Sequence, residues 1–296
     1  MPRTIAYSIP PEADGQTVEQ FLRRRIGMSS RTVVRLKRVA SGMMLDGVHV
    51  RTIDRVAVGQ TLTVTMPEDA VKIDGMPLPL DIIYEDDDLI VIDKPPFLAV
   101  HPSAGKTDPT LANAVVAYFQ QTGEAHSFRP LYRLDRNTSG LLLAAKSAHI
   151  TYLLRERCDC RKTYYAIVLG EVSESGTVNA PIRIKEGCTI TREVGDGGKE
   201  SITHYEPIWT DGCYTLLRLT LETGRTHQIR VHMAYLGHPL VGDTMYGVDE
   251  TLNRHALHCG ELRFLHPICG ENRMFIAPIA EDMRAFLLEK GWKGDE

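Results

Sequence analysis

An uneven distribution of charge divides this sequence into two parts. Residues 1–68 contain 10 Lys and Arg against 6 Asp and Glu, a net charge of +4, whereas the rest of the chain contains 24 against 32, a net charge of −8. A stretch containing Pro and Gly, 69–79, separates them. This pattern predicts a small basic domain (1–68), a linker (69–79) that attaches it flexibly, and a large domain (80–296). A chain of 296 residues buries enough surface to need no disulfide or metal staple.

The basic residues of the first part are concentrated in two predicted helices. Apolar residues recur at helical spacing from Val18 to Ile26, and Ser29-Ser30 can cap a second helix whose buried side would be Val33, Val34 and Leu36. Beyond them, an Asp46-Gly47 turn predicts two short strands, and alternation over 62–66 predicts a third. The cations are Arg23, Arg24, Arg25, Arg31, Arg35, Lys37 and Arg38, with Glu19 as the only acid of the stretch. Mixed charges would solubilise a helix face equally well, so this one-sided pattern favours a polyanionic partner.

Other features of the sequence exclude several classes of protein. Six scattered cysteines form no Cys-x-x-Cys pair, which is typical of reduced thiols rather than of a zinc site. Neither a signal peptide nor an apolar run of about 20 residues is present. We therefore expect a soluble, cytoplasmic protein.

The large part begins with strands and leads to one informative segment. Strands are predicted at 82–84 and 89–92 around the acidic turn 85–88, where a turn is favoured over a metal site, and a helix is predicted from Pro109. The segment 131–140 then leads into an apolar strand, 141–145. Within it, Arg133 and Asp135 are two residues apart and would share one face of an extended chain. A carboxylate beside arginines stays ionised and can act as a nucleophile, although such a pair is more often structural.

Two further segments strengthen a catalytic interpretation. A β-branched and aromatic strand, 162–169, would place Lys162 and Tyr164 on one face, although a strand tyrosine is more often a packed core residue. After Gly224, we expect Thr226 to cap a helix that ends at Gly237. Its expected buried side consists of Ile229, His232, Met233 and Leu236. Arg225 and Arg230 near its start favour an anionic partner, while His227 and His232 are five apart and do not form a same-face zinc pair.

These motifs, in this order, resemble the RluA/RluD family of pseudouridine synthases over nearly all of residues 80–290. The resemblance rests on 133–140, on Lys162-x-Tyr164-x-Ala166 and on 224–232, and it extends to Lys94-Pro95, His101-Pro102, Gly198-Lys199, Gly242-Asp243 and Leu257-His258. Residues 14–68 resemble the small RNA-binding domain named after a ribosomal small-subunit protein. Tyr132 and Phe97 depart from the family, which usually has His and Gly there.

The resemblance implies both a fold and a chemistry. The fold would be α+β, with a mostly antiparallel central sheet and an active-site cleft, plus a small N-terminal α/β RNA-binding domain. The reaction would be the isomerisation of uridine in RNA, which needs no cofactor and no metal. Asp135, Tyr164 and Arg230 would be catalytic, with Arg230 keeping Asp135 ionised. The substrate-binding residues would be Arg133, Leu257, Arg225, His227 and Lys162, and the RNA-binding domain would use Arg23, Arg24, Arg31, Arg35, Lys37 and Arg38.

The expected partner is RNA. Large-subunit ribosomal RNA is favoured over transfer RNA because of the appended basic domain, and a monomer is expected. One alternative is a non-catalytic RNA-binding protein that retains the fold. Another is a glycosidase with a carboxylate nucleophile, but glycosidases normally need a second facing carboxylate, and none stands out in these motifs.

Overall fold

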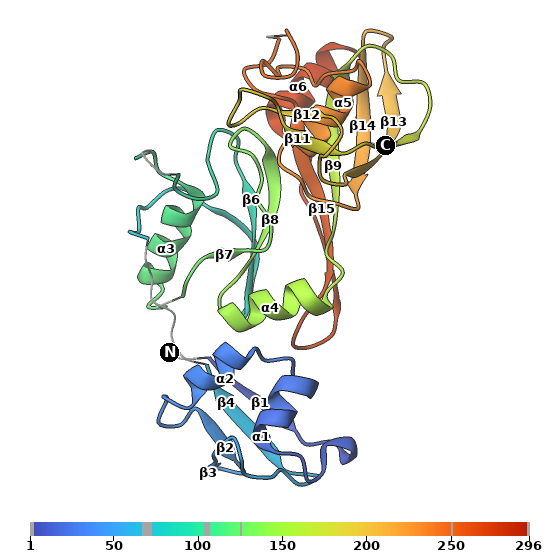
Figure 1. The fold of residues 1–296 in the computed structure, drawn as a ribbon. Helices are drawn as coiled ribbons and strands as arrows, with labels where there is room; N and C mark the ends of the chain where they lie inside the picture. The colour runs from blue at the N-terminus through green and yellow to red at the C-terminus, as the bar shows by residue number, and fades with distance from the viewer. Residues whose placement is uncertain (1–2, 67–72, 104–106, 125, 250, 295–296) are drawn as a thin grey trace.

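The computed structural model describes residues 3–66, 73–103, 107–124, 126–249 and 251–294. Residues 69–72 of the expected linker lie outside these ranges. The described chain is built around two separate sheets, each with its own apolar core (Figure 1). None of the described helices is long and apolar enough to cross a membrane.

Residues 3–66, here called the N-terminal unit, form a four-stranded antiparallel sheet of order β1-β4-β2-β3 covered by short helices. Its elements are β1 (Thr4–Ser8), a 3-10 turn (Pro11–Ala13), α1 (Val18–Gln20), a π-helical turn (Phe21–Arg25), α2 (Ser30–Leu36), β2 (Met43–Leu45), β3 (Val48–His49) and β4 (Thr61–Thr65). Ser29 caps α2 as predicted, because its side chain accepts the backbone N–H of Thr32. Strand β1 was not predicted from the sequence, and Val34 is exposed rather than buried as predicted.

The larger sheet contains ten strands in the order β10-β13-β14-β9-β15-β8-β6-β5, with β16 paired to β15 and β7 to β8. Its strands are β5 (Asp81–Glu85), β6 (Leu89–Lys94), β7 (Arg129–Pro130), β8 (Ser139–Ala145), β9 (Arg161–Leu169), β10 (Gly176–Asn179), β13 (Ile202–Thr210), β14 (Tyr214–Leu221), β15 (Leu257–Leu265) and β16 (Asn272–Ile276). A separate hairpin pairs β11 (Ile182–Ile184) with β12 (Arg192–Val194). Only the β15–β8 pairing is parallel within the large sheet, so the expected α+β architecture with a mostly antiparallel sheet is confirmed.

Among the described residues, four helices accompany the large sheet: α3 (Leu111–Gln121), α4 (Ala148–Arg157), α5 (Gln228–Tyr235) and α6 (Glu281–Glu289). Strands β6 and β8 are continuous apolar runs because both of their faces are buried. Met283, Phe286 and Leu287 of α6 pack in a second cluster against Ile167 and Leu216 of β9 and β14. The middle of the sheet is therefore rigidly packed, and functional side chains emerge where its strands end.

Two helix starts differ from the sequence analysis. Helix α3 is capped by Thr110 rather than started by Pro109. Helix α5 is preceded by His227, not Thr226, with a left-handed φ of 58° at that residue. No side chain at the cap position bonds to the helix; instead the Gln228 side chain accepts the backbone N–H of Arg225. The predicted end at Gly237 is confirmed by its φ of +88°, whereas Leu236 is partly exposed rather than buried.

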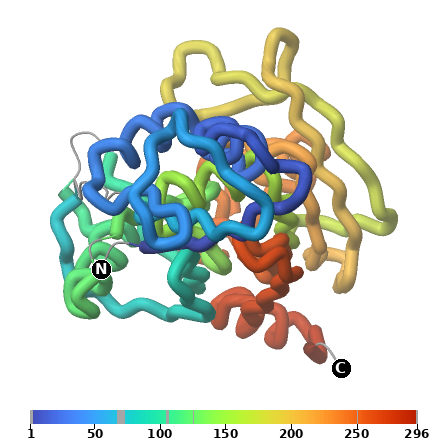
Figure 2. Tube along the Cα trace, turned by 90° about the horizontal axis from the view of Figure 1, so that it is seen from below, coloured from blue at the N-terminus to red at the C-terminus, as the bar shows by residue number. Residues whose placement is uncertain are grey.

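The N-terminal unit packs on the larger part near α4 (Figures 1 and 2). The Arg3 guanidinium bonds both carboxylate oxygens of Asp88, at 2.9 and 3.1 Å. At a second point, Arg157 Nη1 donates to the carbonyl oxygen of Arg25 at 3.1 Å. The partly buried Ile268 side chain contacts both apolar cores. An ion pair, a hydrogen bond and a shared apolar side chain thus join the N-terminal unit to the larger part.

Candidate active site

An open cavity of about 1980 Å³ lies on the larger part of the molecule. Six of the predicted site residues line it: Arg133, Asp135, Lys162, Tyr164, Arg225 and His227. They come from three stretches of the chain, which are the loop before β8, the start of β9 and the loop between β14 and α5. The fold thus brings the three sequence motifs together around one cleft.

Asp135 lies in the turn that precedes β8. Leu134 before it is buried, and the backbone N–H of Thr138 donates to the Asp135 carbonyl oxygen at 3.1 Å. The Asp135 side chain is 28% exposed, and its Oδ2 lies 3.2 Å from Nη1 of Arg230. The carboxylate therefore faces the cavity on one side and a guanidinium on the other, which suits a nucleophile or a base.

Arg230 lies beneath Asp135 and is not part of the cavity lining. Only 6% of it is exposed, and its Nε and Nη2 donate to the two oxygens of buried Asp243 at 2.6 and 2.8 Å. Burial acts against both charges, yet their mutual interaction raises the pKa of Arg230 and lowers that of Asp243. Asp243 thus fixes the guanidinium plane and leaves Nη1 for Asp135.

Two buried cations support the Asp135 turn from behind. Lys94 is fully buried, and its Nζ donates to the carbonyl oxygens of Pro95, Leu98 and Arg136 at 2.8, 2.9 and 3.2 Å. Burial lowers the pKa of Lys94 to about 7, while three acceptors match the three hydrogens of the ammonium form. On the other side of the turn, Arg254 Nη1 donates to the Asn137 carbonyl oxygen at 3.0 Å.

The sequence analysis gave none of these supporting residues a role. Lys94 and Asp243 stand in motifs that carried the family resemblance, so their positions were available as a signal. Arg254 stands in none of them. Its function is apparent only from its contacts, since it is fully buried and also forms a bidentate ion pair with Asp282.

His227 joins the Asp135 carboxylate to the loop before α5. Its Nε2 lies 3.7 Å from Asp135 Oδ2, and its Nδ1 is 2.8 Å from the hydroxyl of Tyr246. Burial lowers the pKa of His227. The left-handed backbone at a residue other than glycine costs about 1 kcal/mol, and such strain concentrates at functional sites.

Tyr164 and Lys162 line the cleft from β9. Tyr164 is 6% exposed, and burial raises the pKa of its phenol well above the ordinary value, so the hydroxyl is neutral at physiological pH. Lys162 Nζ lies 4.6 Å from the centre of the Tyr132 ring. Tyr132, one of the two departures from the family pattern, donates its hydroxyl to the Leu141 carbonyl oxygen at 2.9 Å. Tyr132 thus places an aromatic ring against the ammonium group of Lys162 in the cleft.

The second departure, Phe97, adopts a φ of 64°, the left-handed region that glycine occupies without strain. The family's usual glycine is therefore explained by the backbone. Phe97 is half exposed, and its carbonyl oxygen accepts Nε of Arg136 at 3.1 Å. The loop remains attached to the residue that follows Asp135 despite the substitution.

Some predicted site residues lie elsewhere. Leu257 is 5% exposed, belongs to the apolar core and does not line the cavity, so the geometry gives no support to its predicted contact with the base. His232 is a satisfied core histidine, as predicted, with bonds to Thr203 and Ala180. The predicted RNA-binding cations all lie on the N-terminal unit, where Arg23, Arg24, Arg31, Lys37 and Arg38 are exposed and Arg35 is partly buried.

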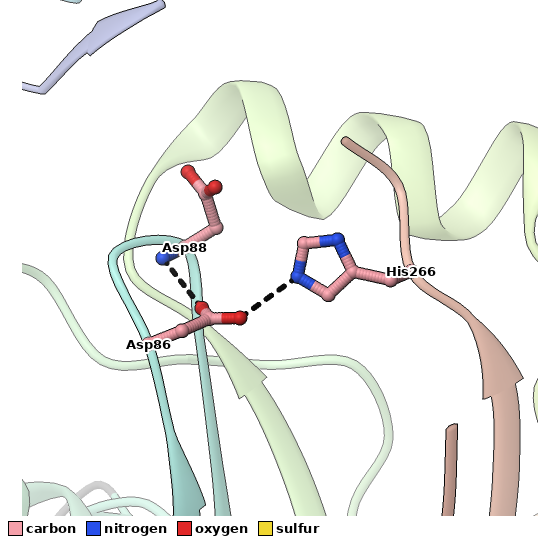
Figure 3. A group of neighbouring side chains, drawn as sticks. All are labelled: Asp86, Asp88 and His266. Atoms are coloured by element: carbon pink, nitrogen blue, oxygen red, sulfur yellow. Dashed lines mark hydrogen bonds and ion pairs between the residues drawn. The ribbon is translucent and has the colours of Figure 1, made fainter. Parts of the chain in front are cut away.

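A second group of acidic and imidazole side chains lies at the turn between β5 and β6 (Figure 3). Asp86, Asp88 and His266 are close enough to hold a metal ion, and His266 comes from 180 residues away. Each ligand atom already has a protein partner, however. Asp86 accepts two backbone N–H groups together with Tyr84 and His266 Nε2, and Arg3 occupies Asp88. The predicted turn is confirmed, and its acids attach β1 to the large sheet.

Comparison with known proteins supports the interpretation of the cleft. Residues 88–235 match the family model described as RNA pseudouridylate synthase. The chain is 38% identical over 274 residues to an uncharacterized RNA pseudouridine synthase, YjbO, of Bacillus subtilis, covering 90% of this chain and 96% of that protein. It is 40% identical over 248 residues to ribosomal large subunit pseudouridine synthase D of Vibrio cholerae, covering 77% and 76%.

A solved structure agrees with these sequence matches. Human RNA pseudouridylate synthase domain containing 1 superposes with a TM-score of 0.54 at 25% identity, covering 74% of this chain and 97% of that one. The family match contains Asp135, Tyr164 and Arg230, the residues whose geometry is described above. The chain is therefore a member of the RluA/RluD-type RNA pseudouridine synthases, and thus an isomerase that acts on RNA.

Proposed function

We propose that this enzyme isomerises uridines of large-subunit ribosomal RNA, with Asp135 as the group that acts on the sugar. The observation that carries the proposal is the position of the Asp135 carboxylate, which faces the open cleft while Arg230 contacts it from below. The Vibrio cholerae relative is named for the large ribosomal subunit. The exposed cations of the N-terminal unit are a second reason to favour this long RNA over transfer RNA.

The reaction breaks the bond between C1′ of the ribose and N1 of the base, and a bond between C1′ and C5 replaces it. C5 loses its proton and N1 gains one, so no atom is lost overall. Asp135 either attacks the sugar or removes a proton from it, and both steps require an ionised carboxylate. Arg230 is the positioning partner for that charge, because Asp243 prevents the guanidinium from turning away.

Other residues of the cleft would bind the nucleotide. The Tyr164 ring at the cleft surface would stack on the uracil, with its neutral hydroxyl available to the moving proton. Arg133, which is exposed at the cleft, would contact the backbone of the flipped nucleotide. Flipping a base costs a few kcal/mol and costs least in a loop, so the expected target is a uridine in a structured RNA loop.

The cleft also bears on the glycosidase alternative. Five carboxylates besides Asp135 line the cavity: Asp108, Asp159, Glu206, Glu222 and Glu261. Each lies within 4.0 Å of a basic side chain. In each of these pairs the basic side chain is exposed, whereas the Arg230 partner of Asp135 is buried, so no other acid of the described cleft lining has the setting of Asp135.

The direct test compares pseudouridine in total RNA from cells that carry the wild-type gene, no gene, or Asp135→Asn. We expect specific large-subunit sites to lose pseudouridine in both altered strains. Glu289→Gln, which removes one exposed carboxylate on α6, is the matched control and should leave every site modified. Wild-type modification by Asp135→Asn would contradict the proposal, and lost sites confined to transfer RNA would reassign the substrate.

A further inference from the structure

The last turn of α4 connects the cleft with the N-terminal unit. Arg155 and Arg157 are two residues apart there, and residues at this spacing point about 200° apart around a helix. Arg157 bonds the Arg25 carbonyl oxygen of the N-terminal unit, whereas Arg155 lines the cavity that contains Asp135. One turn of helix therefore contacts both RNA-facing parts of the molecule.

Arg155 differs from the other arginines that line the cleft near it in the acidic partners of its side chain. Arg161, Arg218 and Arg263 each lie within 3.4 Å of a carboxylate oxygen. In the part of the chain that the structure describes, Arg155 has no such partner, and its side chain is exposed. An exposed arginine without a carboxylate, in a cleft that receives RNA, is well suited to a phosphate group.

The exposed cations continue beyond α4. Arg24 belongs to the same π-helical turn as Arg25, whose carbonyl oxygen bonds Arg157. It is exposed and has no acidic partner within the described residues. The Arg157 bond to Arg25 places this turn at the end of α4. Arg133 in the cleft, Arg155 on α4 and Arg24 thus form a series of unpaired cations.

We propose that Arg155 binds a phosphate of the RNA strand that leaves the cleft towards the N-terminal unit, so that the two parts bind one continuous strand. The inference rests on the proposed function, because it takes the strand at Asp135 to be the RNA substrate. The N-terminal unit then sets the direction in which RNA passes Asp135, because the contacts at Arg157 and Arg3 place it beside α4.

The test measures binding of fluorescent oligouridylates of about 4 to 16 nucleotides to the full chain carrying Asp135→Asn. Adding Arg155→Ala should weaken the binding of strands that reach α4 about fivefold. It should also reduce the slope of log affinity against log salt by about 0.7, the contribution of one phosphate. Arg155→Lys should preserve the slope, because it keeps the charge. Arg284→Ala, which removes an exposed arginine of α6, is the matched control.

Strand length tests continuity. Arg24→Ala should weaken binding only for strands longer than those first affected by Arg155→Ala. Two results would overturn the inference. In the first, Arg155→Ala leaves both the affinity and its salt dependence unchanged at every strand length. In the second, Arg24→Ala weakens the binding of strands that are too short to be affected by Arg155→Ala. Pseudouridine formation by the otherwise wild-type chain is measured separately. If the chain forms no pseudouridine but the effects of Arg155→Ala and Arg24→Ala still depend on strand length as expected, the proposed function is refuted and the proposed path of the RNA strand is retained.

Discussion

Removing the buried partner of Arg230 should separate its structural role from its role at Asp135. In Asp243→Ala, Arg230 would keep the 3.2 Å contact of one nitrogen with Asp135 and its position 4.9 Å from the centre of the Tyr246 ring, but no carboxylate would hold its other two nitrogens. Removing one member of a buried ion pair costs about 3–5 kcal/mol, and we expect the lower end, about 3 kcal/mol, because this contact remains. The double variant Arg230→Met/Asp243→Leu replaces the pair by apolar groups and should recover most of the lost stability.

Activity should not recover with stability. Asp135 loses its charge-assisted hydrogen bond in the double variant, and such a bond contributes about 1.5–3 kcal/mol. If that interaction acts in the transition state, kcat falls about tenfold to hundredfold. Urea unfolding can be followed by the fluorescence of the chain's two tryptophans, Trp209 and Trp292, which pack against the α6 cluster. A double variant that is stable and has wild-type kcat would refute the role assigned to Arg230.

Three further predictions concern single side chains. Among the described residues, buried His149 has no hydrogen-bond partner at either nitrogen, and burial lowers its pKa from 6.5 to about 4. Because the unfolded chain binds the proton first, this histidine should remove about 3 kcal/mol of stability from pH 6.5 to pH 4. His149→Leu should reduce the fall in unfolding free energy, measured in urea across this range, by that amount, while His255 and His258, whose pKa values are also lowered by burial, account for part of the remainder. Lys94→Met deprives three carbonyl oxygens of their donor; unfolding free energy should fall by about 2 kcal/mol and kcat should fall with it. Tyr164→Phe should retain RNA affinity in a filter-binding assay and lose most turnover; weaker binding with unimpaired turnover would contradict this role.

Much of the secondary structure could be predicted because its causes are local. The apolar runs of β6 and β8, the Asp46-Gly47 turn and the Ser29 cap each follow from a few neighbouring residues. The errors occurred where distant contacts decide. Strand β1 exists because Thr4–Ser8 pairs with β4, 53 to 61 residues later, and α5 starts after His227 because Gln228 bonds residues of β13 and the preceding loop.

The residues that face the cleft could be predicted from the sequence, whereas most contacts of the buried residues that hold them in place could not. Asp135, Tyr164 and Arg230 stand in three motifs whose order indicated one site. The pairing of Arg230 with Asp243, and the bonds from Lys94 and Arg254 to the Asp135 turn, join residues between 13 and 117 positions apart. The direction of a buried hydrogen bond depends on how strands and helices pack, and spacing along the chain does not specify it.

The sequence by itself determined which residue types could carry the chemistry, because a carboxylate, a phenol and a guanidinium in ordered motifs define what can react. It also determined that the first 68 residues carry a net charge of +4 and the remainder a net charge of −8. Only the tertiary structure decided that Arg230 has two acidic partners and that one turn of α4 contacts both the cleft and the N-terminal unit. Those facts follow from the folding of distant segments against one another, where burial makes each charge depend on the partner that the fold supplies.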